Sequence, residues 1–557
     1  MIEAICRNAS AMVLVWAAMS IAARAQTFET LLSFNGSNGV SPQYMAMVQG
    51  VDGNFYGTVE RGGHSYGTVF RVTPDGILTT LYSFCAQNNC PDGASPYAGL
   101  VQGTDGNFYG TTYEGGANDY GTVFKITSQG VLTTIYSFCA QTNCSDGSTP
   151  YGGLVQATDG NFYGTTLAGG TVSTLCPLGC GTVFRLTIGG VLTTLHTFCL
   201  QAYCDDGSAP ASALVQATDG SFYGTTTSGG QNDVGTIFKL TASGLLTTLH
   251  SFGNADGINP YSALVQGLDH ALYGTTLAGG SRDAGTVFRI TTAGVLTTLH
   301  SFAGSDGIEP LGGLVQGTDR NLYGTTVVGG ANNYGTLFKI TTAGVLTTLY
   351  NFCSQNGCND GSFPQAGLVQ STNGNFYGTT ENGGDICSCG TIFSLSTNLS
   401  PFLGFVRSSG YVAQTGPILG QGFTGTTNVS LNGTSISFTV KSDTLITATI
   451  PAGGTTGPVT VTTPTGTLTS NVPFRVLPQL LSFTPTSGPV GTQVTITGVS
   501  LTQTTGVGFG DYTPAQFTVN SDTQVTATVP TGAQTGPVGI QTQGGIAIST
   551  QTFTVTQ

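Results

Sequence analysis

Short hydrophobic segments alternate with turn residues along most of the chain, and they recur as a longer unit. The clearest copy spans residues 100–138 and reads LVQGTDGNFYGTTYEGGANDYGTVFKITSQGVLTTIYSF. It contains four runs rich in Val, Leu, Ile, Thr, Phe and Tyr, and such runs bounded by Gly, Asp and Asn are typical of β-strands. We name them strands A to D in chain order: LVQG, NFYGTT, GTVFKIT and VLTTIYSF. The pattern predicts an all-β fold made of four-stranded units.

The unit occurs seven times. The tyrosine of its Tyr-Gly-Thr element recurs after steps of 53, 54, 60, 50, 50 and 54 residues, and such a period is typical of a solenoid, a propeller or a domain array. The seven positions are Tyr56, Tyr109, Tyr163, Tyr223, Tyr273, Tyr323 and Tyr377. The first copy of strand D (28–34, FETLLSF) precedes every A–B–C set, and no strand D follows 390–396. We therefore predict a seven-bladed β-propeller that is closed by its N-terminal strand, which also covers two exposed edges.

Two related segments follow the repeats. Residues 482–501 (SFTPTSGPVGTQVTITGVSL) and 521–542 have counterparts in the same order at 408–423 and 442–463. Alternating strands with Gly and Pro turns favour a small β-sandwich for each segment. The predicted organisation is a signal peptide at 1–25, a propeller at 26–396, a linker at 397–403, and two immunoglobulin-like domains at 404–477 and 478–557.

Composition and the N-terminal residues predict where the protein is located. The 557 residues include 84 glycines but only 7% charged residues, and the net charge of −13 disfavours nucleic acid and anionic membranes as partners. Arg7, an apolar run at 11–22 and the Ala-x-Ala site ending at Ala25 resemble a secretory signal peptide. The run is short for a membrane span. We expect a secreted or cell-surface protein, cleaved near Ala25, with no transmembrane segment in the mature chain.

Twelve cysteines remain after that cleavage, and their positions predict disulfides. Four pairs with C-x4-C spacing occur in the loop from strand D to the next strand A, only where that loop is four residues longer than elsewhere. They are Cys85 with Cys90, Cys139 with Cys144, Cys199 with Cys204, and Cys353 with Cys358, and two closer pairs lie in B–C loops, Cys176 with Cys180 and Cys387 with Cys389. A short disulfide that holds a longer loop explains the pattern. The C-x-C spacing leaves the pairing of Cys387 with Cys389 open. A C-x4-C pair without a second pair beside it is a poor zinc signal.

The sequence offers little catalytic chemistry. His196, His250 and His300 occupy a strand-D position that holds tyrosine elsewhere, and we interpret them as packing residues. Glu60 and Glu114 precede a Gly-Gly pair in two repeats only, and no acid/base carboxylate pair or Ser-His-Asp set can be assembled. The Asp that precedes Gly in six of the D–A loops is interpreted as a turn residue. No cofactor is expected; calcium at these aspartates is the weaker alternative.

One asymmetry points to a ligand. The A–B and C–D turns are short and uniform, whereas the D–A and B–C loops hold all the insertions and several aromatic residues. Function tends to lie on variable loops over a rigid scaffold. The residues predicted to face a ligand are His64, Tyr66, Tyr120, Tyr203 and Tyr334.

Two family resemblances rest on these motifs. The repeated DGNFYGTT…GG…YGTVFKIT…GVLTTLYSF resembles the GloVer (Gloeo/Verruco) tandem-repeat family of exported bacterial proteins, over about 27–396. The resemblance implies export and a propeller-like fold, and no established activity. The two C-terminal segments resemble IPT/TIG immunoglobulin-like domains. In the first of them, Val412-Ala413-Gln414 replaces the usual Pro-Val-Gly.

We interpret the chain as an exported binding or interaction protein that uses the D–A/B–C loop face, with the sandwiches as spacers and no catalysis evident. The sequence does not identify its extracellular ligand, for which a polysaccharide and a surface protein are the candidates. The alternatives are a carbohydrate-active or small-molecule lyase or hydrolase on a propeller scaffold, and a purely structural surface-layer or matrix component. The sequence leaves the enzyme question open.

Overall fold

The computed structural model describes residues 26–557, except for residues 45, 171, 173, 175, 201, 386 and 511. The predicted signal peptide lies outside the described residues. The described chain folds into β-strands and three short 3-10 turns, which confirms the predicted all-β class. Within this part of the chain, no helix is long and apolar enough to cross a membrane.

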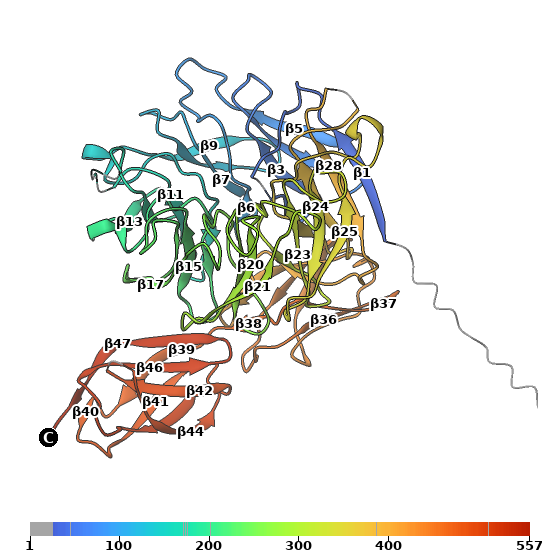
Figure 1. The fold of residues 1–557 in the computed structure, drawn as a ribbon. Helices are drawn as coiled ribbons and strands as arrows, with labels where there is room; N and C mark the ends of the chain where they lie inside the picture. The colour runs from blue at the N-terminus through green and yellow to red at the C-terminus, as the bar shows by residue number, and fades with distance from the viewer. Residues whose placement is uncertain are drawn as a thin grey trace, which may run out of the picture.

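Residues 27–396 form seven antiparallel sheets of four strands each (Figure 1). Six sheets follow chain order: β2 (Val48–Gln49), β3 (Phe55–Val59), β4 (Thr68–Val72) and β5 (Leu78–Ser83); β6 (Val101–Gln102), β7 (Phe108–Thr112), β8 (Thr122–Ile126) and β9 (Leu132–Ser137); β10 (Val155–Gln156), β11 (Phe162–Thr166), β12 (Thr182–Leu186) and β13 (Leu192–Thr197); β14 (Val215–Gln216), β15 (Phe222–Thr226), β16 (Thr236–Leu240) and β17 (Leu246–Ser251); β18 (Val265–Gln266), β19 (Leu272–Thr276), β20 (Thr286–Ile290) and β21 (Leu296–Ser301); β22 (Val315–Gln316), β23 (Leu322–Thr326), β24 (Thr336–Ile340) and β25 (Leu346–Asn351). The 3-10 turns η1 (Thr142–Cys144), η2 (Ala202–Cys204) and η3 (Asn356–Cys358) lie in D–A loops.

The seventh sheet combines the two ends of this region. Strands β26 (Val369–Gln370), β27 (Phe376–Thr380) and β28 (Thr391–Ser396) are completed by β1 (Thr27–Ser33), which pairs antiparallel with β28. The Phe28 ring stacks on Tyr350 of the preceding sheet at a centroid distance of 3.8 Å. The N-terminal strand therefore completes the last unit, as the offset of the strand-D copies predicts.

The Tyr-Gly-Thr element is explained by its neighbours within each sheet. In the second sheet, Gly110 of β7 pairs with Phe124 of β8, and a Cβ at Gly110 would lie 2.7 Å from the Phe124 ring. The glycine thus leaves room for the ring. Tyr109 is buried and donates a hydrogen bond through its hydroxyl to Asp105 in the A–B turn (2.8 Å). Both central strands are therefore buried on both faces.

A glutamine at the end of each strand A joins every sheet to its neighbour. The side-chain oxygen of Gln102 accepts a hydrogen bond from the backbone N–H of Val51, just before the A–B turn of the first sheet (3.1 Å). The same bond recurs at 2.8–3.1 Å between Gln156 and Thr104, Gln216 and Thr158, Gln266 and Thr218, Gln316 and Leu268, Gln370 and Thr318, and Gln49 and Thr372. The last of these bonds links the seventh sheet to the first.

Two β-sandwiches follow, and their sheets share one strand order. The first has β29 (Gly404–Phe405), β31 (Thr415–Leu419), β35 (Leu445–Thr449) and β34 (Phe438–Ser442) facing β33 (Thr434–Ser435), β32 (Asn428–Leu431), β36 (Val459–Thr463) and β37 (Gly466–Thr469), with β30 (Ser409–Gly410) paired to β38 (Arg475–Val476). The second has β39 (Gln479–Thr484), β41 (Gln493–Val499), β45 (Gln524–Thr528) and β44 (Gln516–Ser521) facing β40 (Ser487–Gly488), β47 (Gly545–Val555), β46 (Gly536–Thr542), β42 (Thr504–Phe509) and β43 (Thr513–Pro514).

The first sandwich packs against the repeats, which differs from the expectation of two spacers (Figure 1). Arg407 donates to the carbonyl of Thr158, and Arg475 donates to the carbonyl of Thr218 at 3.2 Å. Both acceptors precede A–B turns. Thr444 donates to a third such carbonyl, that of Val51, at 3.4 Å. The first sandwich therefore covers the A–B side of the repeat region, whereas the second lies apart from the repeats in Figure 1.

Candidate ligand-binding site

A cavity of about 420 Å³ lies at the centre of the repeat region. All seven repeats line it, each with its strand A or the residues just before that strand. Because strand A runs from the D–A loop to the A–B turn, the cavity has a loop end and a turn end. Tyr44, Tyr151, Tyr261 and Gln365 line the loop end. The turn end lies on the side where the first sandwich packs.

Tyrosines cluster at the loop end of the cavity, where Tyr44 and Tyr151 line it and Tyr97 and Tyr113 pack beside them. The rings of Tyr97 and Tyr151 are stacked, with centroids 5.1 Å apart and an interplanar angle of 21°. Tyr44 lies 5.5 Å from Tyr151, and Tyr113 meets the edge of Tyr97 at 5.2 Å. All four side chains are half-buried, so part of each ring stays accessible. Burial raises the pKa of Tyr44, Tyr97 and Tyr151, so these tyrosines are neutral hydrogen-bonding groups over the physiological range.

Two carboxylates lie beside these rings. Glu60 is only 7% exposed, and it accepts hydrogen bonds from the Tyr97 hydroxyl (3.0 Å) and from Arg61 Nε (3.3 Å). Glu381 accepts one from Gln43 Nε2 at 2.6 Å and another from Gln365 Nε2. Burial raises the pKa of Glu381, which its two amide partners oppose and the nearby charge of Glu60 reinforces.

Apart from Tyr44, which is one residue further along the chain than the first position, these residues occupy two equivalent positions of the repeat. The first position follows the proline of each D–A loop and holds Gln43, Tyr97, Tyr151, Ala211, Tyr261, Leu311 and Gln365. The second directly follows strand B and holds Glu60, Tyr113, Leu167, Thr227, Leu277, Val327 and Glu381. The aromatic, amide and acidic members come mostly from repeats seven, one, two and three, and the aliphatic ones mostly from repeats four to six. The loop end of the cavity is therefore polar on one side and apolar on the other.

Such a mouth suits a small neutral molecule with both apolar faces and hydroxyl groups. Ring faces accept apolar contact, and the carboxylate and amide oxygens accept hydrogen bonds. The two carboxylates make the site acidic, and Arg61, with 69% of its side chain exposed, points its charge mainly to solvent. An anionic ligand would meet repulsion there.

The residues predicted to face a ligand lie elsewhere on the same loops. His64 is exposed, and Tyr66, Tyr120 and Tyr334 are 44%, 44% and 39% exposed. These three tyrosines hold equivalent positions before strand C in repeats one, two and six, and the Tyr334 ring contacts Phe363 of the next D–A loop. Tyr203, at 84% exposure, lies in η2. None of the five lines the central cavity.

The sequence does contain a pattern that points to the cluster at the loop end of the cavity, but comparing the B–C loops by their Gly-Gly pairs does not reveal it. The structure aligns Arg61 with Glu114, since each forms the same isolated bridge to the preceding loop. Glu60 is therefore the counterpart of Tyr113 and Glu381, and not of Glu114. An alignment of the repeats on the loop proline and on strand B would have exposed both variable positions.

The strand-D histidines and the loop aspartates are partners. His196, His250 and His300 contact Asp206, Asp256 and Asp306 through Nε2 at 3.0, 2.7 and 2.7 Å. In the other loops, the hydroxyls of Tyr82, Tyr136 and Tyr350 donate to Asp92, Asp146 and Asp360 at 2.7–2.8 Å. The histidines pack as expected, edge-on against Phe198, Phe252 and Phe302 at centroid distances of 5.0–5.1 Å, and they also form a hydrogen bond that the sequence did not predict. The aspartates use their oxygens to organise the D–A loops.

The structure contains all six predicted disulfides. In the D–A loops, Cys85 is bonded to Cys90, Cys139 to Cys144, Cys199 to Cys204, and Cys353 to Cys358. In the B–C loops, Cys176 is bonded to Cys180, and Cys387 is bonded to Cys389, the pairing that the C-x-C spacing left open.

The first of these loops shows how the backbone around a pair is held. The carbonyl of Cys90 accepts hydrogen bonds from the N–H of Gly93 (2.9 Å) and from the N–H of Gly116 (2.8 Å). Gly93 belongs to the same D–A loop, whereas Gly116 belongs to the B–C loop of the second repeat. The half-buried Cys90 therefore connects two loops through its backbone, in addition to closing its own loop through sulfur.

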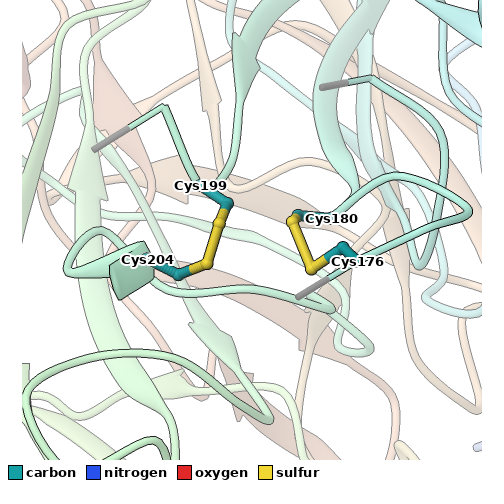
Figure 2. Close-up of side chains that lie close together, drawn as sticks. All are labelled: Cys176, Cys180, Cys199 and Cys204. Carbon is teal, nitrogen blue, oxygen red and sulfur yellow. A yellow bond between two sulfur atoms is a disulfide. The ribbon is translucent and has the colours of Figure 1, made fainter. Parts of the chain in front are cut away.

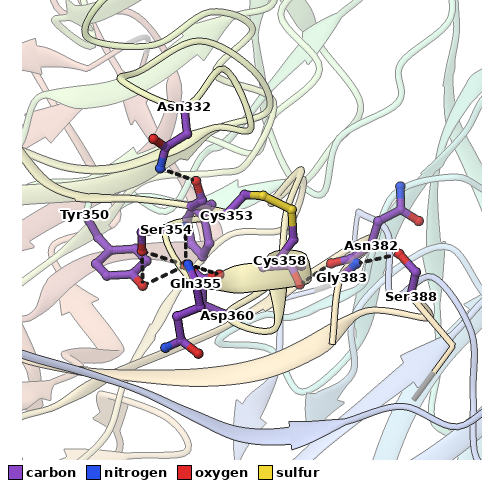
Figure 3. The surroundings of a disulfide bond; sticks show 12 residues. Asn332, Tyr350, Cys353, Ser354, Gln355, Cys358, Asp360, Asn382, Gly383 and Ser388 are labelled. Atoms are coloured by element: carbon purple, nitrogen blue, oxygen red, sulfur yellow. Dashed lines mark hydrogen bonds between the residues drawn. A yellow bond between two sulfur atoms is a disulfide. The ribbon is translucent and has the colours of Figure 1, made fainter. Parts of the chain in front are cut away.

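Figure 3 shows the setting of another pair. Cys353–Cys358 closes a loop in which buried Asp360 accepts hydrogen bonds from the Tyr350 hydroxyl and from the backbone of Ser354 and Gln355. The disulfide and the aspartate together fix the longer D–A loop.

Comparisons with known proteins place the chain in a family. A model described as the Gloeobacter/Verrucomicrobia repeat matches residues 17–199 and 170–393, and the IPT/TIG domain model matches residues 478–556. A comparison with curated proteins found no match.

Several solved structures align with the chain at low similarity. The extracellular domain of a protein described as a hybrid two-component system from B. thetaiotaomicron aligns with a TM-score of 0.44 at 10% identity, over 94% of this chain and 58% of its own length. A fungal alcohol oxidase of the AA5 family in complex with copper aligns with a TM-score of 0.41 at 11% identity, over 95% of this chain and 99% of its own. A surface glycan-binding protein from Prevotella bryantii aligns with a TM-score of 0.22 at 15% identity, over 28% of this chain and 39% of its own. At this level of similarity, they do not indicate a shared function.

Proposed function

The chain belongs to the family of Gloeobacter/Verrucomicrobia repeat proteins, and we propose that it is an extracellular binding protein that takes its ligand into the loop end of the central cavity. The observation that carries the proposal is the cluster of Tyr44, Tyr97 and Tyr151 with Glu60 and Glu381 at that end. Six disulfides support an oxidising, extracellular environment.

The scaffold of this site is a closed seven-bladed β-propeller with 404–477 as a first IPT/TIG-like domain and 478–557 as a second. The pairing of β1 with β28, the hydrogen bond from Thr372 to Gln49 and the cavity lined by all repeats support closure. The strand order shared by the two sandwiches supports a common type for both. In this arrangement, the first sandwich limits access from the A–B side, so a ligand enters from the D–A and B–C loops.

The ligand class that fits best is a neutral sugar, as a free saccharide or as part of a polysaccharide. A sugar ring presents apolar C–H faces that stack on tyrosine and hydroxyls that donate to carboxylate and amide oxygens. The stacked pair Tyr97 and Tyr151 supplies the platform, and Glu60 and Glu381 supply the acceptors. The same carboxylates disfavour acidic glycans.

A co-sedimentation experiment with the mature chain, 26–557, tests this function. Neutral polysaccharides should deplete the protein from solution, and uronic-acid polymers should not. The double variant Tyr97→Ala/Tyr151→Ala should weaken binding at least about tenfold, which corresponds to about 1.4 kcal/mol. The matched variant Tyr66→Ala/Tyr120→Ala removes two exposed tyrosines of the same loops outside the cavity and should bind normally. Loss of binding in the second variant only would move the site to the outer loop face.

A second candidate function is hydrolysis or elimination on the same ligand. It is favoured by the pair Glu60 and Glu381, whose hydrogen-bond partners differ and which influence each other electrostatically. Analysis of the supernatant for released products distinguishes it from binding. Products that disappear in both Glu60→Gln and Glu381→Gln would make the enzyme the primary function.

A further inference from the structure

The third repeat brings two cysteine pairs together. Cys176–Cys180 lies in the B–C loop, and Cys199–Cys204 lies in the following D–A loop. The four sulfur atoms lie within 4.8 Å of one another, and the two disulfides face each other in Figure 2. Cys180, Cys199 and Cys204 are 1%, 8% and 2% exposed, and Cys176 is half-buried. The sulfur cluster is therefore largely shielded from water.

This arrangement is confined to one repeat among the described residues. Three other D–A loops have a pair of the same spacing, and the B–C loops of their own repeats contain no cysteine. These pairs are Cys85 with Cys90, Cys139 with Cys144, and Cys353 with Cys358. The third repeat is also the longest, with 60 residues to the next Tyr-Gly-Thr tyrosine. Its additional B–C residues bring the second pair next to the first, so a loop insertion created a four-sulfur cluster.

Four thiolates at this spacing are the ligand set of a structural zinc site. Zinc binds four cysteines as a tetrahedron with Zn–S distances of about 2.3 Å, which places the sulfurs about 3.8 Å apart. The observed limit of 4.8 Å is close to that geometry. We propose that Cys176, Cys180, Cys199 and Cys204 form a tetrathiolate site for a thiophilic divalent ion of the zinc class, and that the two disulfides are its oxidised, metal-free form.

The conversion balances with a dithiol as the reductant. Two dithiol molecules transfer four electrons and four protons to the two disulfides, and each dithiol leaves as a cyclic disulfide. One divalent ion then displaces four protons and binds four thiolates. In the reverse step, two molecules of the dithiol's cyclic disulfide accept four electrons from the four thiolates and four protons from solvent, which re-forms the two protein disulfides and releases the ion.

The backbone around the site is held independently of the disulfides. The N–H of Ala209, in the D–A loop, donates to the carbonyl of Cys180 in the B–C loop at 2.9 Å. Asp206, 3% exposed, accepts a hydrogen bond from the N–H of Cys199 at 3.0 Å and also contacts His196. The N–H of Gly207 donates to the carbonyl of Cys204 at 2.8 Å. The first of these bonds joins the two loops, and the other two hold the D–A loop around Cys199 and Cys204, so this backbone support does not depend on the disulfides.

The test is a metal titration of the full mature chain after anaerobic reduction by a dithiol and removal of the reductant. With Co²⁺ as the probe, the expected result is one equivalent bound, with the intense visible bands of a tetrahedral thiolate site, and displacement by one equivalent of Zn²⁺. Zn²⁺ should also raise the melting temperature of the reduced chain. The untreated, oxidised chain should bind neither ion.

Two double variants separate this site from the other cysteines. Cys176→Ser/Cys180→Ser should abolish the tetrathiolate spectrum and weaken Zn²⁺ binding at least about 100-fold. Cys139→Ser/Cys144→Ser, which removes a pair of the same spacing in an equivalent loop, should leave both unchanged. The single variant Cys176→Ala, at the half-buried position, keeps three thiolates and should shift the spectrum while the chain stays folded by circular dichroism. A reduced, folded wild-type chain that binds no Co²⁺, or equal binding by the two double variants, would overturn the proposal.

Discussion

At the scale of single residues, six of the seven D–A loops are organised by one carboxylate and one partner in strand D, and the first loop has Asn38 in place of the carboxylate. Asp146 is completely buried and accepts hydrogen bonds from the Tyr136 hydroxyl (2.7 Å) and from the backbone N–H groups of Ala140 and Gln141. A buried carboxylate is stable only when its oxygens are paired. In the third repeat, whose D–A loop has the same length, His196 replaces the tyrosine and contacts Asp206. Tyrosine and histidine thus have the same role at this strand-D position, since each is a hydrogen-bond partner of the buried carboxylate.

Tyr136→Phe should destabilise the protein by about 1–3 kcal/mol, because it removes a donor from a buried carboxylate. Tyr136→His should cost much less, since histidine fills this role in the third repeat. Thermal or urea unfolding of the three proteins measures the difference. Equal losses for both variants would show that ring packing, and not the hydrogen bond, is what the position requires.

A second prediction concerns Glu381, whose pKa is raised by burial. The folded protein therefore holds this proton more tightly than the unfolded chain does, and stability falls as pH rises from the unfolded pKa through the folded one. Glu381→Gln removes this dependence. Relative to wild type, the variant should be more stable at about pH 7 than at about pH 4, where wild-type Glu381 is itself largely protonated. A difference in melting temperature that does not change between these two pH values would contradict the assignment.

At the scale of elements, β1 is the strand on which the seventh sheet depends. Its pairing with β28 supplies an edge that β26, β27 and β28 lack on their own. Phe28 of β1 also contacts the preceding sheet, stacked on Tyr350, and lies 5.2 Å from Phe393 of β28. An uncovered β28 would present free backbone groups to other chains.

A chain that begins after residue 34 should therefore melt at a lower temperature and self-associate. A synthetic peptide of residues 26–34, added in excess, should restore both the melting temperature and the monomeric elution volume. The same peptide with Phe28→Ala is the control and should bind at least about tenfold more weakly, because it lacks the stacked ring. A truncated chain that remains monomeric and equally stable would show that β1 is dispensable.

At the scale of the whole molecule, two half-buried cations connect the first sandwich to the repeats. Arg407 and Arg475 donate to carbonyls beside two A–B turns. Burial lowers the pKa of both guanidinium groups, and in Arg475 the charge of Arg407 adds to this effect. The two desolvated cations donate to neutral carbonyl oxygens, and the nearest aspartates contribute only through their charge. The strength of the interaction therefore depends on how well the hydrogen bonds to these carbonyls are aligned.

Arg407→Ala combined with Arg475→Ala should free the first sandwich from the repeat region. Small-angle scattering should record a larger radius of gyration, with little change in secondary structure by circular dichroism. Lys441→Ala, at an exposed position of the same sandwich, is the matched control and should leave the scattering profile unchanged. A compact double variant would show that the two arginines are not required for docking.

What the sequence could predict depends on how locally each feature is encoded. Strands, tight turns and disulfides could be read directly, since alternation, Asp-Gly pairs and loop lengths are local, and the displaced strand D indicated the role of β1. The cavity cluster could not be predicted in this way. Each repeat contributes only one or two residues to it, such as Tyr97 or Glu381, and these come together only when the sheets have assembled. The docking of the first sandwich uses backbone carbonyls as acceptors, which every residue carries. The facing cysteine pairs required the spatial adjacency of two loops.

The pairing of β1 with β28 also constrains the order of events during synthesis. Strand β1, which begins at Thr27, is the first described strand to leave the ribosome. Its partner β28, which ends at Ser396, is made only after every other repeat strand. Until then, the N-terminal segment has no strand to pair with, while six complete sheets can already pair within themselves. The nascent chain therefore carries an unpaired β1 until the whole repeat region has been synthesised. If synthesis stops before β28, the seventh sheet cannot form.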